Sequence, residues 1–198
     1  MSATELLDVF DRYGEHTGAS LTKHVIHEQE LWHGGAHIWI YNGKGEVLLQ
    51  LRAPDKDIYP NTWDISAAGH VSAGETPIQT ALRETQEELG LSLQPQELEF
   101  IGVTRTIQAI PTTGWTHRVF DWTYIVRKEV AISDLHLQKE ELAGARWVSL
   151  VEFATDLQDV SKSAQYSPRP FYLYDLAITE MRKALQREEK QEENIPES

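Results

Sequence analysis

The stretch from Gly69 to Leu91 decides the fold and reads Gly-His-Val-Ser-Ala-Gly-Glu-Thr-Pro-Ile-Gln-Thr-Ala-Leu-Arg-Glu-Thr-Gln-Glu-Glu-Leu-Gly-Leu. Its second half predicts a helix over residues 77–89. Thr76 is a suitable N-cap, because Pro77 follows at the first helical position and Gln79 completes a capping box. Gly90 stands where a left-handed residue ends a helix.

This helix has an apolar face and an acidic face when its residues are projected at about 100° each. Glu84, Glu87 and Glu88 share the acidic face near the C-terminal end. Like charges one turn apart cost a few tenths of a kcal/mol, and the helix dipole disfavours anions at this end. A hard cation such as Mg²⁺ or Mn²⁺ would relieve the repulsion, whereas a solvated acidic face is the alternative. The apolar face should be buried and comprises Ile78, Ala81, Leu82, Thr85 and Leu89.

The loop before the helix favours a cation-binding site over a solvated acidic face. Gly69 and Gly74 have no side chain, so the backbone of the loop can approach a neighbouring group closely. Glu75 adds a fourth carboxylate at the N-terminal end of the helix. Loop and helix together resemble the Nudix box, Gly-x5-Glu-x7-Arg-Glu-U-x-Glu-Glu-x-Gly-U, where U is a bulky aliphatic residue. One position departs from it: Thr85 has a hydroxyl, which can donate to the carbonyl of Ala81 while its methyl group faces the core.

The resemblance continues upstream of the box. Leu49-Gln-Leu-Arg52, followed by Tyr59-Pro-x-x-Trp-Asp-Ile-Ser-x-Ala-Gly-His70, is similar to the Nudix subgroup related to isopentenyl diphosphate isomerase. It covers roughly residues 5–155 and is strongest over 37–91. The resemblance implies an α/β/α sandwich around a mixed sheet and a metal-dependent diphosphohydrolase.

Resemblance also implies roles for individual residues. Glu84, Glu87 and Glu88 would bind Mg²⁺ or Mn²⁺ together with the carbonyl of Gly69. Glu140 and Glu141, in a loop before a late strand, are further candidate ligands, with a solvated loop as the alternative.

Two more pairs complete the predicted site. Arg83 should orient a carboxylate and Glu75 should steady Arg83 or its loop, so both join the three helix glutamates in the catalytic set. Arg52 and His70 are the candidates for substrate binding. His70 matches a metal-ligand position of the isomerase, and a structural role is its alternative. Which carboxylate is the general base stays open.

The order of the chain suggests three parts. Residues 1–35 form an N-terminal β extension, 36–160 the Nudix domain, and 161–198 a connector, a helix over 171–186 and a charged, frayed tail from 187. Specificity should lie in the N-terminal extension, in the loop 53–62 and in a flexible loop around 108–117. His24, His27 and His33 are predicted to be polar surface residues, because no spacing places them on one face. Strands are expected at 5–10, 37–42, 46–52, 63–68, 98–106, 119–126 and 145–150, with a helix at 151–157.

The amino-acid composition limits the classes of molecule that the protein is expected to bind. The 198 residues include 18 Lys plus Arg against 31 Asp plus Glu, a formal net charge of −13, and no basic run. Nucleic acid polymers and anionic membranes are therefore not expected partners, and a phosphorylated small molecule would need a metal. The chain has no cysteine, which excludes disulfides and thiolate sites. We expect a cytoplasmic enzyme, either a monomer or a homodimer.

Two alternatives to a hydrolase remain. The isomerase has a cysteine immediately before its Gly-His pair, and Ala68 stands there in this chain, so one of the two proton-transfer groups is missing. A non-catalytic nucleotide sensor on the same scaffold would not need the complete acidic set. The expected reaction is therefore hydrolysis of a diphosphate linkage in a nucleoside diphosphate derivative or a related small organic diphosphate.

Overall fold

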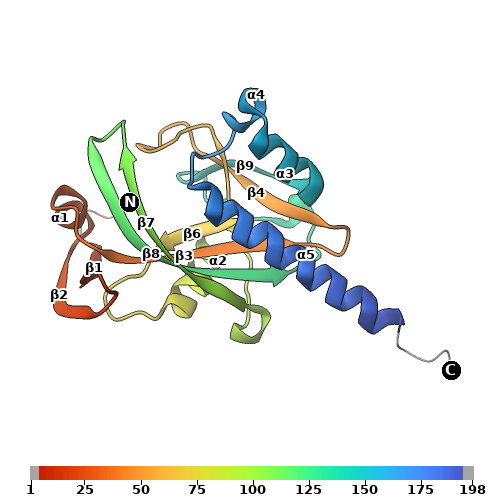
Figure 1. The fold of residues 1–198 in the computed structure, drawn as a ribbon, viewed down its shortest axis with the longest axis horizontal. Coiled ribbons are helices and arrows are strands. Elements are labelled where there is room, and N and C mark those ends of the chain that lie inside the picture. The colour runs from red at the N-terminus through yellow and green to blue at the C-terminus, as the bar shows by residue number, and fades with distance from the viewer. Residues whose placement is uncertain (1–4, 194–198) are drawn as a thin grey trace.

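A mixed sheet lies between two helical layers in the computed structural model, which describes residues 5–193 (Figure 1). The strand order is β5-β4-β3-β8-β7, with β6 paired to β3 and β9 paired to β4. Only β3 and β8 run parallel among the pairs of this sheet, so the predicted mixed sheet is confirmed. Its strands are β3 (His33–Tyr41), β4 (Glu46–Arg52), β5 (Trp63–Asp64), β6 (Ala67–His70), β7 (Glu99–Ile110), β8 (Trp115–Arg127) and β9 (Leu142–Ser149).

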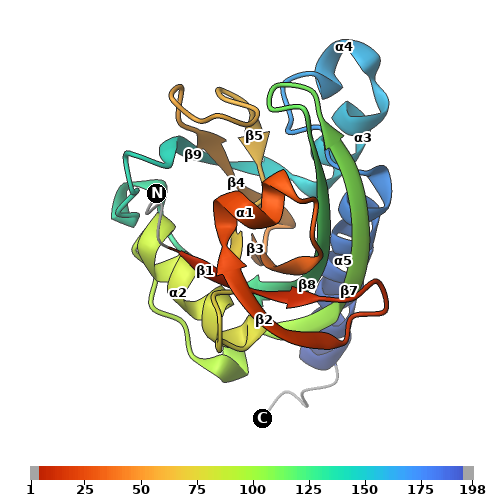
Figure 2. The same cartoon turned by 90° about the vertical axis from the view of Figure 1, so that its left-hand side faces the viewer.

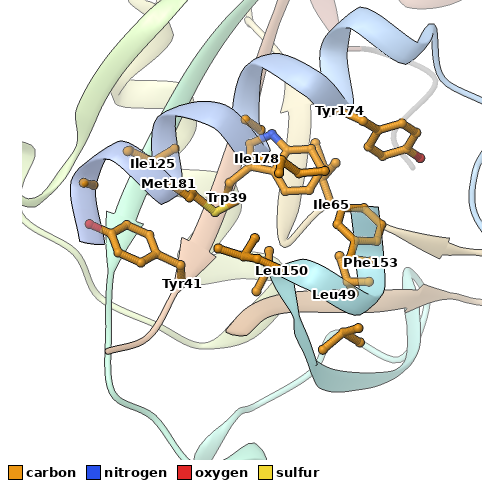
Figure 3. Close-up of a cluster of buried hydrophobic side chains, with 14 of the residues drawn as sticks. Trp39, Tyr41, Leu49, Ile65, Ile125, Leu150, Phe153, Tyr174, Ile178 and Met181 are labelled. Carbon is orange, nitrogen blue, oxygen red and sulfur yellow. The ribbon is translucent and has the colours of Figure 1, made fainter. Parts of the chain in front are cut away.

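Helices cover both faces of the sheet. Figure 2 shows α2 (Pro77–Leu89) on one side and α5 (Phe171–Glu193) on the other. Strand β3 is buried along its whole length, and its side chains alternate between the two faces. Trp39 packs in the core beneath α5, with Met181 and with Phe153 of α3 (Leu150–Gln158) (Figure 3), whereas Ile38 packs beneath α2.

The helix α2 has the predicted ends. Thr76 and Gln79 form the capping box, and Gly90 ends the helix at φ 73°. Ala81 and Leu89 are buried, whereas Ile78 and Leu82 are only partly buried against the same core. Thr85 is buried on the apolar face, and its hydroxyl donates to the carbonyl of Ala81 at 2.8 Å, as expected.

The N-terminal extension forms a separate hairpin of β1 (Leu6–Phe10) and β2 (His16–Thr22), followed by α1 (Lys23–Glu28). Leu7, Val9 and Ile26 make a small core of their own. The hairpin holds the loop before α2, because the N–H of Gly74 donates to Asp8 at 2.9 Å. In Figure 2, α1 lies in front of the sheet, between α2 and the hairpin of β7 and β8.

Two expectations for the second half of the chain need correction. The predicted flexible loop around 108–117 is mostly strand, because β7 and β8 stay paired out to Ile110 and Trp115 and only residues 111–114 turn. The C-terminal helix continues past 186 at least as far as Glu193, and within this added part Glu188 pairs with Arg127 at 2.9 Å and holds the helix onto the sheet. The end of the predicted frayed tail, 194–198, lies outside the described residues.

Four short elements were not predicted from the sequence. They are α1, α4 (Val160–Ser163) and two single 3-10 turns at 95–97 and 132–134. Among the helices of residues 5–193, none combines the length and the apolar character that a membrane span requires.

Candidate active site

A cavity of about 920 Å³ opens at one end of the sheet, and it collects every residue predicted for the site. The acidic face of α2 forms one wall. The rest of the cavity is bordered by the N-terminal extension, the loop 53–62 and the ends of β7 and β8. These are the three segments that we expect to set specificity. The predicted residues that line it are Arg52, Gly69, His70, Glu75, Arg83, Glu84, Glu87, Glu88, Glu140 and Glu141.

Two of the three helix glutamates are withdrawn from water. Glu88 is only 6% exposed and accepts the N–H of Ala68 at 3.1 Å. Burial, reinforced by Glu84, raises the pKa of Glu88 well above its usual range. Burial also raises the pKa of Glu84 to about 7, although Arg83 opposes the shift. Glu87 lies further out, with its side chain 52% exposed. Burial and mutual repulsion therefore both disfavour the ionised forms of the Glu84 and Glu88 carboxyl groups.

Gly69 is required by the close approach of Glu84. A Cβ at position 69 would lie 2.0 Å from the carboxyl carbon of Glu84. No side chain fits there unless the glutamate moves. Gly69 of β6 and Glu84 of α2 therefore pack directly against each other, and this packing requires a glycine at position 69.

Arg83 connects the carboxylates of the helix to the loop. Its Nη1 donates to Glu84 at 2.7 Å and to Glu87 at 3.2 Å. Its Nε and Nη2 both donate to Glu75 at 3.0 Å, and Glu75 also accepts the hydroxyl of Thr80 at 2.7 Å. These are the contacts expected of an arginine that orients carboxylates and of a glutamate that steadies it.

Arg52 and the late glutamates are less free than the sequence suggested. The guanidinium of Arg52 donates to the carbonyl of Ile58 at 2.8 and 3.0 Å, so it holds the loop 53–62. Glu141 forms an ion pair with Lys56. Glu140 is exposed at the rim of the cavity.

A buried charged network at the cavity floor was not predicted. Arg169 binds Asp64 with two hydrogen bonds of 2.7 and 2.9 Å, and it lies 3.1 Å from Nε2 of His37. Asp121 lies 3.2 Å from the same His37 nitrogen. Although burial opposes it, Arg169 lowers the pKa of Asp64 to about 2, whereas burial raises the pKa of Asp121 to about 7. No local pattern links residues 64 and 169, so only the fold reveals the pair.

Four histidines gather beside the acidic face, and for two of them the prediction of surface residues is wrong. His27 and His33 are buried, and together with His70 and His117 they bring one ring nitrogen each within 4.8 Å of the others. Burial lowers the pKa of His27 to about 4 and of His33 to about 3, so both rings are neutral at pH 7. The four come from α1, β3, β6 and β8, which is why spacing did not place them on one face. Only His24 of the predicted group is exposed.

Part of the cavity wall is apolar. Ile58, Ile110 and Trp115 line it on the side of the loop 53–62 and the β7–β8 hairpin. Gln108 and Tyr59 connect these two segments through a hydrogen bond of 3.2 Å. The cavity therefore offers carboxylates on one wall and a hydrophobic surface on another.

Comparison with known proteins agrees with this architecture. The protein-family model of the NUDIX domain matches residues 31–169 of the sequence. A Nudix hydrolase of Listeria monocytogenes is 39% identical over 140 residues, which cover 71% of this chain and 74% of that protein. Nudix hydrolase 3 of Arabidopsis thaliana is 36% identical over 154 residues, or 76% of this chain, which spans only 20% of that longer protein.

More distant matches extend the comparison. An isopentenyl-diphosphate Delta-isomerase of Escherichia coli is 28% identical over 155 residues, 74% of this chain and 78% of the isomerase. The crystal structure of DR0079 from Deinococcus radiodurans superposes with a TM-score of 0.61 at 19% identity, covering 83% of this chain and all of that one, so it supports the fold. The matched family model covers most of the chain and includes the acidic helix. The chain therefore belongs to the Nudix hydrolase family.

Proposed function

We propose that the protein hydrolyses a diphosphate linkage in a nucleoside diphosphate derivative or a related small organic diphosphate, with Mg²⁺ or Mn²⁺ as cofactor. The observation that carries this proposal is that the acidic face of α2 opens onto the cavity, with Glu84 seated against Gly69. Nudix hydrolases generally use divalent metal ions.

The donor set fits a hard dication. Glu84, Glu87 and Glu88 offer only carboxylate oxygens on one wall, and such oxygens suit Mg²⁺ and Mn²⁺. Burial raises the pKa values of Glu84 and Glu88, and a bound dication would favour their ionised forms. When bound, the metal would neutralise phosphate charge and lower the pKa of a bound water.

Arg83 and Glu75 hold the carboxylates of α2 in place for metal binding. Arg83 fixes the carboxyl groups of Glu84 and Glu87, and Glu75 fixes Arg83, so the acidic face is held in one arrangement before substrate arrives. Such preorganisation is effective because charge stabilisation then costs no rearrangement at the reacting step. Glu140 and Glu141 line the same cavity and are secondary candidates for the metal.

Substrate binding follows from the shape of the cavity. The apolar surface of Ile58, Ile110 and Trp115 suits the organic part of the substrate, such as a base. The diphosphate would then lie toward α2, near Arg52 and His70 at the cavity wall. We propose a small-molecule partner, and we expect a cytoplasmic location.

Isomerisation of isopentenyl diphosphate is the second candidate, favoured by the resemblance to the Escherichia coli isomerase. The residue at the expected cysteine position is Ala68, whose backbone N–H supports Glu88 and whose side chain cannot transfer a proton. We expect no isomerisation at enzymatic rates.

A substrate panel tests both candidates together. Nucleoside di- and triphosphates, nucleotide sugars, dinucleotides and prenyl diphosphates should be incubated with Mg²⁺, with Mn²⁺ and with a chelator, and phosphate release and the allylic isomer measured. We expect metal-dependent phosphate release from at least one class and no allylic product. Absence of hydrolysis across the panel, or formation of the allylic product, would overturn the proposal.

A further inference from the structure

We propose that Asp121 of β8 selects the organic part of the substrate by donating a hydrogen bond to an oxygen of that part. The protein then prefers a polar organic group, such as a nucleoside, to a hydrocarbon chain. The inference rests on the proposed hydrolysis of a diphosphate and adds the class of organic group attached to it. Asp121 lines the cavity together with His37 and Arg169, and none of the three belongs to α2.

The distance across the sheet fits this role. Gly35 of β3 pairs with His70 of β6 on one side and with Asp121 on the other. Neighbouring strands lie about 4.8 Å apart, so the backbone at Asp121 lies about 10 Å from the backbone at His70. A substrate whose diphosphate lies near His70 can therefore place its organic part at Asp121.

The fold reserves a space beside Gly35 for the carboxyl group of Asp121. A Cβ at position 35 would lie 2.5 Å from Oδ1 of Asp121, so a glycine is required there. Oδ2 of Asp121 accepts the hydroxyl of Thr106 at 3.3 Å, and the residue is only 3% exposed. The carboxyl group is therefore held in one place at the cavity floor.

The neighbouring ring of His37 accepts a hydrogen bond through Nε2. Burial lowers the pKa of His37 well below its usual range, so the ring is neutral at pH 7. Arg169 has only N–H donors, and its Nη1 lies 3.1 Å from Nε2 of His37. Nε2 therefore carries the lone pair of the ring, and Nδ1 carries the proton.

The same lone pair faces Asp121. Oδ1 of Asp121 lies 3.2 Å from Nε2 of His37. An ionised oxygen would be repelled by a lone pair at this distance, whereas a carboxylic acid presents an O–H. Burial raises the pKa of Asp121 to about 7, which agrees with a proton on this group. Because Arg169 already donates to the single lone pair, the proton of Asp121 is left for another acceptor.

A ligand oxygen fits as that acceptor. The other carboxylate of the floor, Asp64, already accepts Nε and Nη2 of Arg169 and the N–H of Ile65. A carbonyl or hydroxyl oxygen of the substrate would accept the proton of Asp121, whereas a hydrocarbon chain would bury that proton without a partner. An unpaired buried donor of this kind costs about ten- to a hundredfold in affinity.

The test compares two ligands that share a diphosphate and differ in the organic part. Methylene-bridged analogues of uridine diphosphate and geranyl diphosphate, which cannot be hydrolysed, should be titrated by calorimetry into the full chain in excess Mg²⁺. The ratio of the two affinities removes what the metal and the acidic face contribute to both. We expect the wild type to bind the uridine analogue at least about tenfold more tightly.

Three variants separate the hydrogen bond from the shape of the floor. Asp121→Asn keeps a donor, so it should keep the affinity ratio of the wild type within about threefold. Asp121→Leu is similar in size but has no donor, so the ratio should fall by at least about tenfold. Asp175→Leu, at an exposed position, is the control and should behave as the wild type.

The wild type alone supplies a result if Asp121→Leu fails to fold by circular dichroism. A wild type that binds the geranyl analogue as tightly as the uridine analogue would overturn the inference. So would a folded Asp121→Leu with the affinity ratio of the wild type. If neither analogue binds in Mg²⁺, the proposed diphosphate site itself is refuted, and the role of Asp121 falls with it.

Discussion

At position 69, the absence of a single methyl group lets Glu84 reach the cavity. A Cβ there would meet the carboxyl carbon at 2.0 Å, so the glycine decides where the first carboxylate of the acidic face lies. The sequence identified Gly69 and Glu84 through a pattern of spacing. It could not show that a side chain at position 69 would clash with Glu84, because that contact exists only once β6 packs on α2.

Gly69→Ala should therefore lower kcat/KM by about a hundredfold, because a displacement of about 1 Å in a catalytic group costs that much. The rate should be measured with the best substrate of the panel over a range of Mg²⁺. Gly144→Ala is the matched control, since its nearest neighbour would be Leu51 at an ordinary 3.9 Å. Activity of Gly69→Ala within twofold of the control would disprove the steric argument.

Glu87 tests the charge of the acidic face separately from its shape. Glu87→Gln keeps the volume but removes an anionic oxygen from the wall of the cavity, so turnover should fall by orders of magnitude. The free energy of unfolding without metal should change by less than about 1 kcal/mol, because an exposed pair such as Arg83–Glu87 contributes little. Both quantities can be measured on one preparation, by phosphate release and by urea denaturation.

The control for Glu87 must come from outside the packed part of α5. Glu188 looks like a tail residue in the sequence, but it pairs with Arg127 and accepts the hydroxyl of Tyr41. The exposed neighbour Glu189 is the better choice, and Glu189→Gln should change neither activity nor stability. Near-normal metal-dependent turnover in Glu87→Gln would mean that the acidic face is not the catalytic centre.

Among the elements, those with their own start and stop signals were predicted best. The capping box and Gly90 define both ends of α2 from local sequence alone. Elements whose ends depend on a distant partner were predicted poorly. The strands β7 and β8 are longer than expected because they pair with each other as far as Ile110 and Trp115. The helix α5 is longer than expected, and Glu188 in its added part forms an ion pair with Arg127.

The helix α5 supplies one side of the main core, and Met181 is its most deeply buried large side chain, at 0% exposure. Met181→Ala should reduce the free energy of unfolding by about 2–5 kcal/mol, through lost apolar contact and the cavity left behind. The exposed Lys183→Ala on the same helix should change it by less than about 0.5 kcal/mol. Urea denaturation of both variants decides the point. Equal stabilities would show that α5 does not close the core.

Over the whole molecule, the sequence predicted what is local and missed what the fold assembles. The Nudix box is one continuous segment, so its carboxylates could be placed from their spacing. The Asp64–Arg169 pair joins residues 105 positions apart, and the histidine cluster joins α1 to three strands. Hydrophobic periodicity carries no information about such pairings, since it specifies a face but not the partner.

The buried network also makes the stability of the whole chain depend on pH. Burial raises the pKa of Asp121 from 3.8 to about 7. Between these values the folded state keeps a proton on Asp121 that the unfolded chain has released, so the contribution of Asp121 to the free energy of unfolding falls as the pH rises. Asp121→Asn keeps the shape and cannot ionise, so this part of the decline should vanish.

Urea denaturation across that pH window measures the effect. The stability advantage of the wild type over Asp121→Asn should shrink by a few kcal/mol at most as the pH rises to about 7. The exposed Asp175→Asn should keep the pH dependence of the wild type. A pH dependence of Asp121→Asn equal to that of the wild type would contradict a protonated Asp121.

In the proposed reaction, water activated at the acidic face of α2 attacks a diphosphate linkage. Turnover of the best panel substrate in water enriched in the heavy oxygen isotope, followed by phosphorus NMR, tests it most directly. We predict one heavy oxygen in one phosphate of the products, formed with Mg²⁺ or Mn²⁺ and lost with a chelator or in Glu87→Gln. Products without the heavy isotope, or label that appears equally in chelator and in Glu87→Gln, would contradict it.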